Sequence, residues 1–400
     1  MPDAKERVLI VGAGPVGLVA AANLAQAGIP SIVLESSDAL PKDLRASTFH
    51  PPTLDMLDRF GISQKLIDRG LICPQWQFRD RNEGVVAQFD MGMIADETNH
   101  PYRLQCEQWK LTEELREQIE ASDMTELVYG VEGISVAQDD DSVSLGLRHA
   151  DGSEEIVQGK YLIAADGAHS QVRRSLGIDF EGQTIPEIFL SMSTTFEFPD
   201  AIPDLAPIAY VTDPDEWAVL LRTPSLWRVL LPTDPTLSDA QIKDPDVMEQ
   251  RLQKLCPKEG RYDLVHSTAY RVQERVAKSY VHGRIFLAGD AAHVNNPLGG
   301  MGMNGGIHDA INLSEKLAEV WFGAPLTLMG RYERQRRKVA IETVQAQTLR
   351  NRKMMAEGDP AARQAYHDEL RAVVTDDKTH KAYLMRSSML QSLKDMETVA

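Results

Sequence analysis

The sequence predicts an α/β fold in which a parallel sheet flanked by helices is joined by a second, mixed-sheet α+β domain and a helical C-terminus. Three observations predict it. An apolar run at 8–11 passes through a glycine-rich turn into an alanine-rich helix and then into a second apolar run at 31–34. Apolar and polar residues alternate at 191–198 and 217–222, and residues 331–400 have a helical composition.

Length and composition narrow the class of protein. The chain has 400 residues, which predicts two or three domains. Its content of 43% hydrophobic and 25% charged residues is that of a globular protein. The net charge of −17 repels phosphate and argues against a nucleic-acid partner. A basic run at 331–338 and 350–353 is interpreted as a solvated helix face, with membrane or polyanion binding as the alternative.

The cysteines and the N-terminus point to a reducing compartment. Cys73, Cys106 and Cys256 are odd in number and widely spaced, which fits neither a disulfide framework nor a zinc site. Charged residues run directly into the first predicted strand, so the expected sections of a signal peptide are missing. No apolar run reaches the length of a membrane span. We therefore expect a cytoplasmic protein with no stable membrane association.

The first predicted strand, turn and helix have the spacing of a dinucleotide site. Gly12 permits a tight turn, Gly14 lets a pyrophosphate approach the backbone, and Gly17 allows close packing of helix on strand. The helix N-terminus offers free N–H groups to an anion. Glu35 ends the second strand, where it can accept hydrogen bonds from an adenosine ribose, and its charge disfavours a 2′-phosphate. FAD or NAD is therefore expected, with the candidate ligands Gly12, Gly14, Pro15, Val16, Gly17, Glu35 and Ser36.

Two later segments also combine a strand with an acidic residue and a loop. The strand at 283–288 runs into Asp290, and a glycine-dense loop at 297–306 precedes a predicted helix at 307–320. The segment 161–173 is a strand that ends in Asp-Gly and is followed by Ser and Arg. In this order, the three motifs resemble those of the class A FAD-dependent aromatic monooxygenases of the para-hydroxybenzoate hydroxylase type. The resemblance covers most of the chain.

The resemblance implies a set of cofactor contacts. Asp290 would accept a hydrogen bond from the ribityl chain of FAD, and Gln105 would reach the same chain. Arg45 would contact the FAD phosphate and, together with His169, bind NAD(P)H. The cofactor-binding candidates that follow from the resemblance are Arg45, Gln105, Asp166, His169, Asp290, Pro297, Gly300, Gly302, Met303 and Asn304.

The resemblance also implies the reaction. NAD(P)H would reduce the flavin, dioxygen would form a flavin hydroperoxide, and a phenolic or related heteroaromatic substrate would be hydroxylated. Pro297 matches the family position beside the reactive edge of the flavin. The base that deprotonates the phenol stays open among His50, Tyr210 and Tyr270, each of which is equally compatible with a packing role.

Two arginines of the predicted substrate sheet are further candidates. Arg222 and Arg228 alternate with apolar residues, so each either binds a substrate carboxylate or faces solvent.

The motif positions divide the chain into three parts. We expect a discontinuous Rossmann-like FAD-binding domain at 1–71, 104–182 and 280–330 and a substrate domain at 72–103 and 183–279. The C-terminal helical segment 331–400 either covers the sheet or forms a homodimer contact.

Three other functions remain alternatives. An FAD-dependent dehydrogenase or reductase shares the FAD motifs, because these motifs do not report oxygen chemistry. A flavin-dependent halogenase shares the fold, and residues 227–232 partly resemble its WxWxIP string. A non-enzymatic flavin-binding module is disfavoured by the presence of Asp290 and the complete glycine loop.

Overall fold

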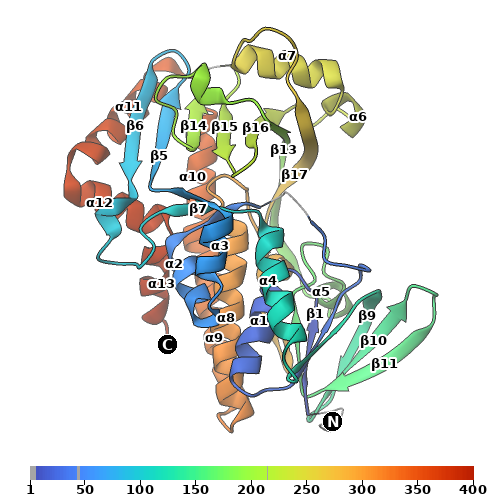
Figure 1. The fold of residues 1–400 in the computed structure, drawn as a ribbon. Helices are drawn as coiled ribbons and strands as arrows, with labels where there is room; N and C mark the ends of the chain where they lie inside the picture. Colours follow the sequence, from blue (N-terminus) through green and yellow to red (C-terminus); the bar gives the residue numbers. More distant parts are fainter. Residues whose placement is uncertain (1–5, 43–45, 214) are drawn as a thin grey trace.

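Two large sheets organise the molecule. The computed structural model describes residues 6–42, 46–213 and 215–400. A six-stranded sheet and an eight-stranded sheet lie at opposite ends of the molecule, and the long helix α8 runs beside the first of them (Figure 1). Smaller three-stranded sheets complete the fold. The predicted α/β class, with its mixed second sheet and helical C-terminus, is confirmed.

The six-stranded sheet has the order β18-β19-β12-β1-β2-β8. Its inner strands pair in parallel and are buried on both faces, as their continuous apolar runs predict. Its strands are β1 (Val8–Val11), β2 (Ser31–Leu34), β8 (Thr125–Val128), β12 (Tyr161–Ala164), β18 (Val281–His282) and β19 (Ile285–Leu287).

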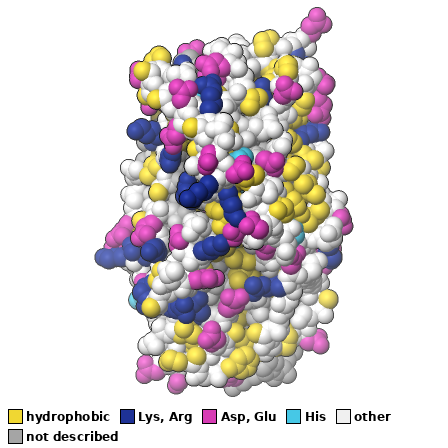
Figure 2. All heavy atoms as spheres, turned by 90° about the vertical axis from the view of Figure 1, so that its left-hand side faces the viewer, with side chains coloured by type: hydrophobic (Ala, Val, Ile, Leu, Met, Phe, Trp, Pro, Cys, Tyr) yellow, Lys and Arg dark blue, Asp and Glu magenta, His cyan; other side chains and the backbone are white. Residues whose placement is uncertain are grey.

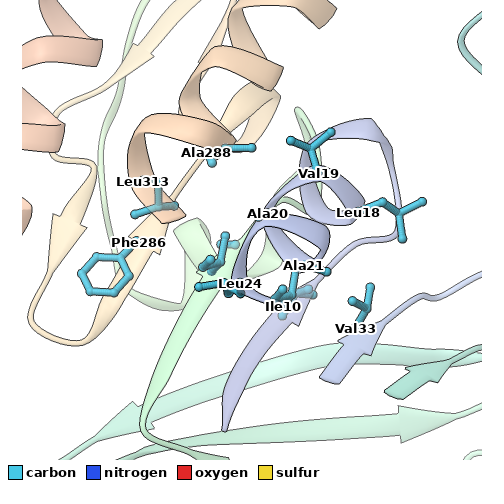
Figure 3. Close-up of a cluster of buried hydrophobic side chains, with 14 of the residues drawn as sticks. Ile10, Leu18, Val19, Ala20, Ala21, Leu24, Val33, Phe286, Ala288 and Leu313 are labelled. Atoms are coloured by element: carbon cyan, nitrogen blue, oxygen red, sulfur yellow. The ribbon is translucent and has the colours of Figure 1, made fainter. Parts of the chain in front are cut away.

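Helix α1 (Pro15–Gln26) packs between this sheet and two other helices. Its partners are α4 (Gln108–Glu120) and α8 (Met301–Trp321). Figure 3 shows Leu24 of α1 on the side of the helix that faces Phe286 and Leu313, and Leu18 on the opposite side, in the same buried cluster as Ile10. All five side chains are fully buried, and burying such a side chain stabilises the fold by about 1.5–3 kcal/mol.

The eight-stranded sheet is mixed. Its order is β20-β17-β13-β16-β15-β14-β5-β6, and the pair β14 and β5 is parallel while the other pairs are antiparallel. Its strands are β5 (Gln75–Asp80), β6 (Gly84–Asp90), β13 (Phe180–Thr194), β14 (Ile208–Thr212), β15 (Ala218–Arg222), β16 (Trp227–Thr233), β17 (Leu264–Ala277) and β20 (His293–Val294).

The predicted C-terminal end of the strand at 191–198 was wrong. Strand β13 stops at Thr194, whose hydroxyl accepts a hydrogen bond from the N–H of Phe196 (3.2 Å). Local bonding of this kind turns the chain out of the sheet. Phe196 and Phe198 then pack edge to face and contribute to the apolar layer beneath the strand.

The C-terminal helices cover the eight-stranded sheet. Met354, Leu370, Tyr383 and Leu384 join the core that also contains Trp76 of β5. Of the two roles predicted for the segment, covering the sheet is the one observed. Its elements are α9 (Met329–Lys338), the π-helical segment η6 (Val339–Gln345), α10 (Ala346–Met355), α11 (Pro360–Thr375), α12 (Asp377–Ser387) and α13 (Leu390–Glu397).

The basic run is distributed rather than gathered into one patch. Figure 2 shows Lys and Arg side chains lying among Asp and Glu side chains on the side of the molecule occupied by α11 and α12. Arg350 pairs with Glu369, and Arg352 pairs with Glu187. The Arg350–Glu369 pair is exposed, and a pair of this kind contributes about 0–1 kcal/mol, in keeping with a solvated helix face. No helix in the described part of the chain is long and apolar enough to cross a bilayer.

The remaining elements connect the sheets. The three cysteines are buried free thiols. Two three-stranded sheets have the orders β3-β7-β4 and β11-β10-β9. These elements are β3 (Thr48–Phe49), α2 (Pro51–Leu57), α3 (Ser63–Arg69), β4 (Leu71–Cys73), β7 (Arg103–Gln105), β9 (Val131–Gln138), β10 (Val143–His149), β11 (Glu154–Gly159), α5 (Gln171–Ser175), α6 (Asp239–Ile242) and α7 (Pro245–Leu255).

Candidate active site

A cavity of about 660 Å³ extends from the carboxyl ends of the six-stranded sheet to the eight-stranded sheet. Four segments far apart in the sequence line it: the first glycine turn, strand β3, the Asp-Gly motif and the glycine loop. The eight-stranded sheet contributes the opposite wall. The volume of the cavity lies within the usual range for a ligand site. The cavity also lies at the carboxyl ends of the strands, where α/β sheets bind ligands.

The first turn has the shape that a dinucleotide requires. Gly12 has a φ of +102°, and a Cβ there would lie 2.4 Å from the carbonyl oxygen of Ala165. A Cβ on Gly17 would lie 2.0 Å from the carbonyl oxygen of Gly12. In contrast, a Cβ on Gly14 would meet no atom within 4 Å, because Gly14 borders the cavity. The open space lies at the N-terminus of α1, where an anion is stabilised.

Glu35 lies at the rim of the same space. One carboxylate oxygen accepts a hydrogen bond from the N–H of Ala13 (2.9 Å), and the other accepts one from the N–H of Ser37 (2.9 Å). These bonds fix the carboxylate at the end of β2, and Glu35 lines the cavity. The glycines and the acidic residue therefore fit an adenine dinucleotide with an unphosphorylated ribose.

Asp166 brings a buried carboxylate to the cavity. Its Oδ2 accepts a hydrogen bond from the N–H of Val172 (3.2 Å), while Oδ1 is buried without a hydrogen-bond partner within the described residues. Burial raises the pKa of Asp166. An orphaned oxygen of this kind is costly unless a ligand supplies a donor, which supports a polar cofactor at this position.

Arg173 joins the Asp-Gly motif to the Asp290 loop. Its guanidinium donates to the carbonyl oxygens of Ala291 (2.7 Å) and Ala168 (2.8 Å). Ser170 caps α5 by accepting a hydrogen bond from the N–H of Arg173 (3.0 Å). The Ser and Arg of the motif therefore hold together two loops that carry Asp166 and Asp290.

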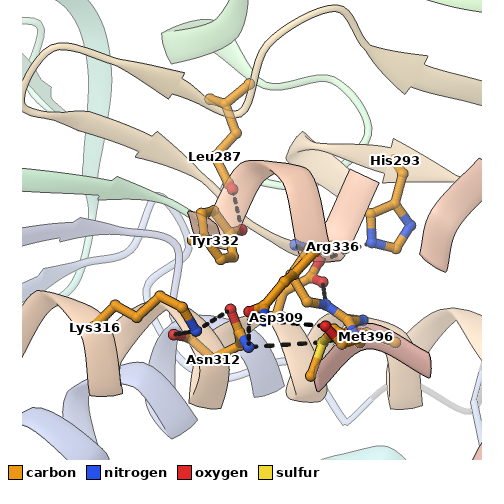
Figure 4. Close-up of polar contacts among 11 residues, drawn as sticks. Leu287, His293, Asp309, Asn312, Lys316, Tyr332, Arg336 and Met396 are labelled. Atoms are coloured by element: carbon orange, nitrogen blue, oxygen red, sulfur yellow. Dashed lines mark hydrogen bonds and ion pairs between the residues drawn. The ribbon is translucent and has the colours of Figure 1, made fainter. Parts of the chain in front are cut away.

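A buried ion pair holds the Asp290 loop from behind. Asp309 of α8 accepts hydrogen bonds from the N–H of Gly289 (3.0 Å), His293 Nε2 (2.7 Å) and Arg336 Nε (2.5 Å), as Figure 4 shows for the side chains. Burial opposes ionisation, yet the charge of Arg336 and the hydrogen bonds lower the pKa of Asp309 to about 2. Arg336 belongs to the predicted basic face but is only 1% exposed, so the solvated-face prediction was wrong for this residue.

The glycine loop is short because α8 starts within it. The helix begins at Met301 rather than at the predicted Ile307. The side chain of Asn304 accepts a hydrogen bond from the N–H of His50 (2.9 Å) and donates to the carbonyl oxygens of Thr48 (2.8 Å) and Gly300 (2.7 Å). Asn304 therefore binds the loop to β3, and the glycine-rich first turn of α8 stays open toward the cavity.

His50 does not border the cavity. Its Nε2 is 2.8 Å from the carbonyl oxygen of Gly299, so Nε2 carries the proton and Nδ1 is left as an acceptor. Burial, assisted by the charge of Arg103, lowers the pKa of His50 to about 3, which keeps the ring neutral. The structure thus gives His50 a role in holding the glycine loop, and its burial argues against the proposed role as substrate base.

The wall contributed by the eight-stranded sheet is apolar with a few polar groups. Tyr210, Tyr270 and Arg228 reach the cavity, and Arg228 also donates to the hydroxyl of Ser47 (3.0 Å). Burial raises the pKa of Tyr270, although the charge of Arg228 opposes this effect. Arg222 does not border the cavity and pairs with Glu197 (2.7 Å).

The structure brings most of the predicted site residues together around one cavity. Those that line it are Gly14, Pro15, Val16, Glu35, Asp166, His169, Tyr210, Asp290, Pro297, Gly300, Gly302 and Met303. Those outside the lining are Gly12, Gly17, Ser36, His50, Gln105 and Asn304. Gln105 donates to the hydroxyl of Thr48 (2.9 Å), so it supports β3 from behind. Arg45 lies outside the described residues.

Arg103 also lines the cavity, and sequence reasoning missed it. The available signal was its position two residues before Gln105 in a short strand, which places both side chains on the same face.

Comparison with known proteins agrees with this geometry. A family model described as FAD binding domain matches residues 5–347. Para-nitrophenol 4-monooxygenase from Pseudomonas sp. (strain WBC-3) is 33% identical over 397 residues, covering 98% of this chain and 95% of that protein. 6-Hydroxy-3-succinoylpyridine 3-monooxygenase from Pseudomonas putida (strain DSM 28022 / S16) is 34% identical over 346 residues, covering 85% of this chain and 86% of that protein.

A solved structure extends the likeness to the whole fold. The crystal structure of p-nitrophenol 4-monooxygenase from Pseudomonas putida DLL-E4 superposes with a TM-score of 0.91 at 32% identity, covering 97% of this chain and 98% of that chain. These relatives favour oxygen insertion over the dehydrogenase, halogenase and non-enzymatic alternatives. The chain belongs to the FAD-binding domain family and is an FAD-dependent aromatic monooxygenase that uses NAD(P)H and dioxygen.

Proposed function

We propose that the substrate is a single-ring phenol or hydroxypyridine with an electron-withdrawing group para to the hydroxyl, and that oxygen is added at the carbon bearing this group. The names of two relatives describe such a position. Carbon 4 of para-nitrophenol bears the nitro group, and carbon 3 of 6-hydroxy-3-succinoylpyridine bears the succinoyl group opposite the hydroxyl. The cavity wall of the eight-stranded sheet is the observation that extends this proposal to the present chain.

This wall suits a flat ring with a polar atom at each end. Ile208, Val219, Leu221 and Leu230 supply an apolar surface. Buried apolar walls with a few fixed polar groups are typical of sites for small aromatic ligands. The polar groups on the substrate side are the tyrosine hydroxyls and the arginines described above.

The protein groups have distinct tasks in this proposal. FAD, when bound between Asp166, Asp290 and the glycine loop, supplies hydride acceptance and oxygen activation. The raised pKa of Tyr270 keeps its hydroxyl protonated at neutral pH, so it acts as a hydrogen-bond donor to the substrate. Pro297 and the loop after it exclude water beside the reacting ring. Of the residues considered as the substrate base, Tyr210 stays a candidate, because it lines the cavity and His50 does not.

The nicotinamide cofactor is assigned to the exposed rim of the cavity. His169 lines the cavity and is exposed to solvent, which suits a co-substrate that enters and leaves in each cycle. We propose that His169 and Arg45 bind NAD(P)H. The three-part domain division, a homodimer and a cytoplasmic location also stay predictions.

The reaction with 4-nitrophenol tests the substrate proposal. The atoms balance when 4-nitrophenol, dioxygen, NAD(P)H and a proton give benzoquinone, nitrous acid, NAD(P)⁺ and water. We expect 4-nitrophenol to stimulate NAD(P)H oxidation, with one nitrite released for each NAD(P)H consumed. Phenol, which has no group at the para carbon, serves as the matched compound. Two results would overturn the proposed position of attack. One is that 4-nitrophenol stimulates NAD(P)H oxidation but no nitrite is released, and the other is that phenol stimulates NAD(P)H oxidation and 4-nitrophenol does not.

Asp290→Ala tests the ribityl contact. Losing a charge-assisted hydrogen bond costs about 1.5–3 kcal/mol, so we expect FAD to bind about ten- to a hundredfold more weakly. Asp290→Asn keeps an acceptor oxygen of the same shape and should lose less. Titration of the apoprotein with FAD, followed by flavin fluorescence, gives the dissociation constants. An unchanged constant in the alanine variant would remove Asp290 from the FAD site.

A further inference from the structure

Arg103 is a buried cation that faces the cavity. It begins strand β7, in which Leu104 points into the core of the six-stranded sheet and Arg103 and Gln105 point the other way. Register places Arg103 opposite Cys73 of β4. The residue is only 3% exposed, and it borders both the main cavity and a small pocket of about 20 Å³ next to it.

The described residues supply no hydrogen-bond partner for Nε of this guanidinium. Within the described residues, no carboxylate lies within the 4 Å of an ion pair, and Nε is buried without a hydrogen-bond partner. The observed attractive contact is with the ring face of Trp76, whose centroid lies 4.7 Å from the guanidinium carbon. A cation–π contact contributes about 0.5–2 kcal/mol, which is less than the cost of several kcal/mol for burying an unpaired ion.

Cys73, Tyr383 and His50 lie near Arg103 and are neutral at physiological pH. Burial raises the pKa of the Cys73 thiol and of the Tyr383 phenol to about 12, although the charge of Arg103 opposes both shifts. Burial lowers the pKa of His50 to about 3, as described above. Tyr210, which lines the same two pockets, adds a phenol. Cys73, Tyr383 and His50 therefore do not neutralise the guanidinium.

Arg228, which also lines the cavity, differs from Arg103 in its partners. Arg228 donates to Ser47, and its charge is one of those that lower the pKa of Glu107 against the opposing effect of burial. Glu107 also pairs with Lys110 at 2.7 Å. Arg228 therefore has an anionic neighbour in the protein, and Arg103 is left to be neutralised by a ligand.

We propose that Arg103 binds the phenolate oxygen of the substrate, so that the cavity selects the ionised form of the phenol. This proposal rests on the phenolic substrate proposed above. A phenolate brings a full negative charge on a flat ring, which matches a guanidinium set among Trp76, Tyr210 and Tyr383. Ionisation also makes the ring electron-rich, which the addition of oxygen requires. Arg103 would thereby determine both substrate charge and orientation.

Ligand binding to the holoenzyme without NAD(P)H tests the proposal independently of turnover. The two probes are 4-nitrophenol, at a pH where it is ionised, and 4-nitroaniline, which has the same shape but stays neutral. We expect Arg103→Gln to weaken binding of 4-nitrophenolate about ten- to a hundredfold and that of 4-nitroaniline less than about twofold. Arg103→Lys should restore most of the difference because it keeps the charge.

Two controls secure the interpretation. The first control is Arg222→Gln, which removes a positive charge from an arginine that pairs with Glu197 and does not border the cavity. The Arg222→Gln protein should therefore bind both probes with wild-type affinity. The second control is a difference spectrum of 4-nitrophenol bound to the wild-type holoenzyme, which tests the proposal even when the Arg103→Gln protein does not retain FAD. This spectrum should show 4-nitrophenol bound as phenolate at a pH where the free compound is mostly protonated.

Three results would overturn the proposal. Equal weakening of both probes in Arg103→Gln would place the nitro group, not the phenolate, at Arg103. Unchanged binding of 4-nitrophenolate would remove Arg103 from the substrate site. A wild-type spectrum of the protonated phenol would show that the cavity does not select the anion. Nitrite release answers the separate question of the proposed reaction, so a failure of either hypothesis can be recognised.

Discussion

Gly14→Val should give a folded protein that no longer retains FAD. Gly14 has an extended backbone with a φ of −70°, which a valine adopts without strain. Its new side chain would meet no protein atom near Cβ and would project into the cavity at the N-terminus of α1. That space is where a pyrophosphate is held. We expect FAD to bind at least about a hundredfold more weakly, a loss of about 2.8 kcal/mol.

Thermal unfolding and FAD titration of the purified apoprotein separate the two effects. The melting temperature of Gly14→Val apoprotein should match that of wild-type apoprotein. Gly17→Val is the matched comparison, because its Cβ would lie 2.0 Å from the carbonyl oxygen of Gly12 and should destabilise the fold itself. A yellow Gly14→Val protein with a full complement of FAD would disprove the assignment of the cavity.

Asp309→Asn should strongly destabilise the protein. The variant keeps the shape of the side chain but removes the ion-pair partner of Arg336, which is 1% exposed. Removing one partner of a buried ion pair costs about 3–5 kcal/mol. Asparagine keeps only one of the two acceptor oxygens that Asp309 uses, so an amide NH2 group would face either Arg336 or the N–H of Gly289 and the ring of His293. Either arrangement disturbs the loop that carries Asp290, so FAD affinity should fall as well. Denaturant unfolding of the apoprotein gives the change in the free energy of unfolding.

Glu315→Gln provides the control for Asp309→Asn. Both acidic residues lie on α8, but Glu315 forms an exposed pair with Arg59 at 2.6 Å, so its loss should cost less than about 1 kcal/mol. Equal effects of the two substitutions would refute the structural role given to Asp309.

The contribution of Asp309 to the free energy of unfolding should depend on pH. Its folded-state pKa of about 2 lies below the ordinary value of 3.8, so its ionised form adds stability above about pH 4. That contribution, about 2 kcal/mol, is lost as the pH falls toward 2. The stability difference between wild type and Asp309→Asn should therefore shrink over this interval. A constant difference would mean that folding does not lower the pKa of Asp309.

Local motifs predicted the cofactor side of the site well. Gly14, Glu35, Asp166 and Asp290 were identified because each occupies a fixed place relative to a strand end, and the structure places all four around one cavity. The start of α8 at Met301 was missed because glycine has a low intrinsic preference for helix. Tertiary hydrogen bonds of Asn304 to β3 stabilise that first turn.

Residues that act through long-range packing were beyond local patterns. The basic run around Arg336 predicts a surface position for this residue, yet Arg336 is buried and pairs with Asp309 of a different helix. His50 was a plausible base until its bond to Gly299 placed it behind the loop. The sequence did not identify Arg103, because the property that marks it is a buried Nε with no hydrogen-bond partner among the described residues. That property depends on what the fold brings near each side chain.

Incorporation of isotopically labelled dioxygen is the most direct test of the central conclusion, that this chain is an aromatic monooxygenase. The purified holoenzyme would be supplied with NAD(P)H, 4-nitrophenol and labelled dioxygen, and the ring product, reduced at once to its stable hydroquinone, would be analysed by mass spectrometry. We expect one labelled oxygen atom in the ring product for each NAD(P)H consumed. A product that carries no label, with NAD(P)H oxidised in full, would contradict it.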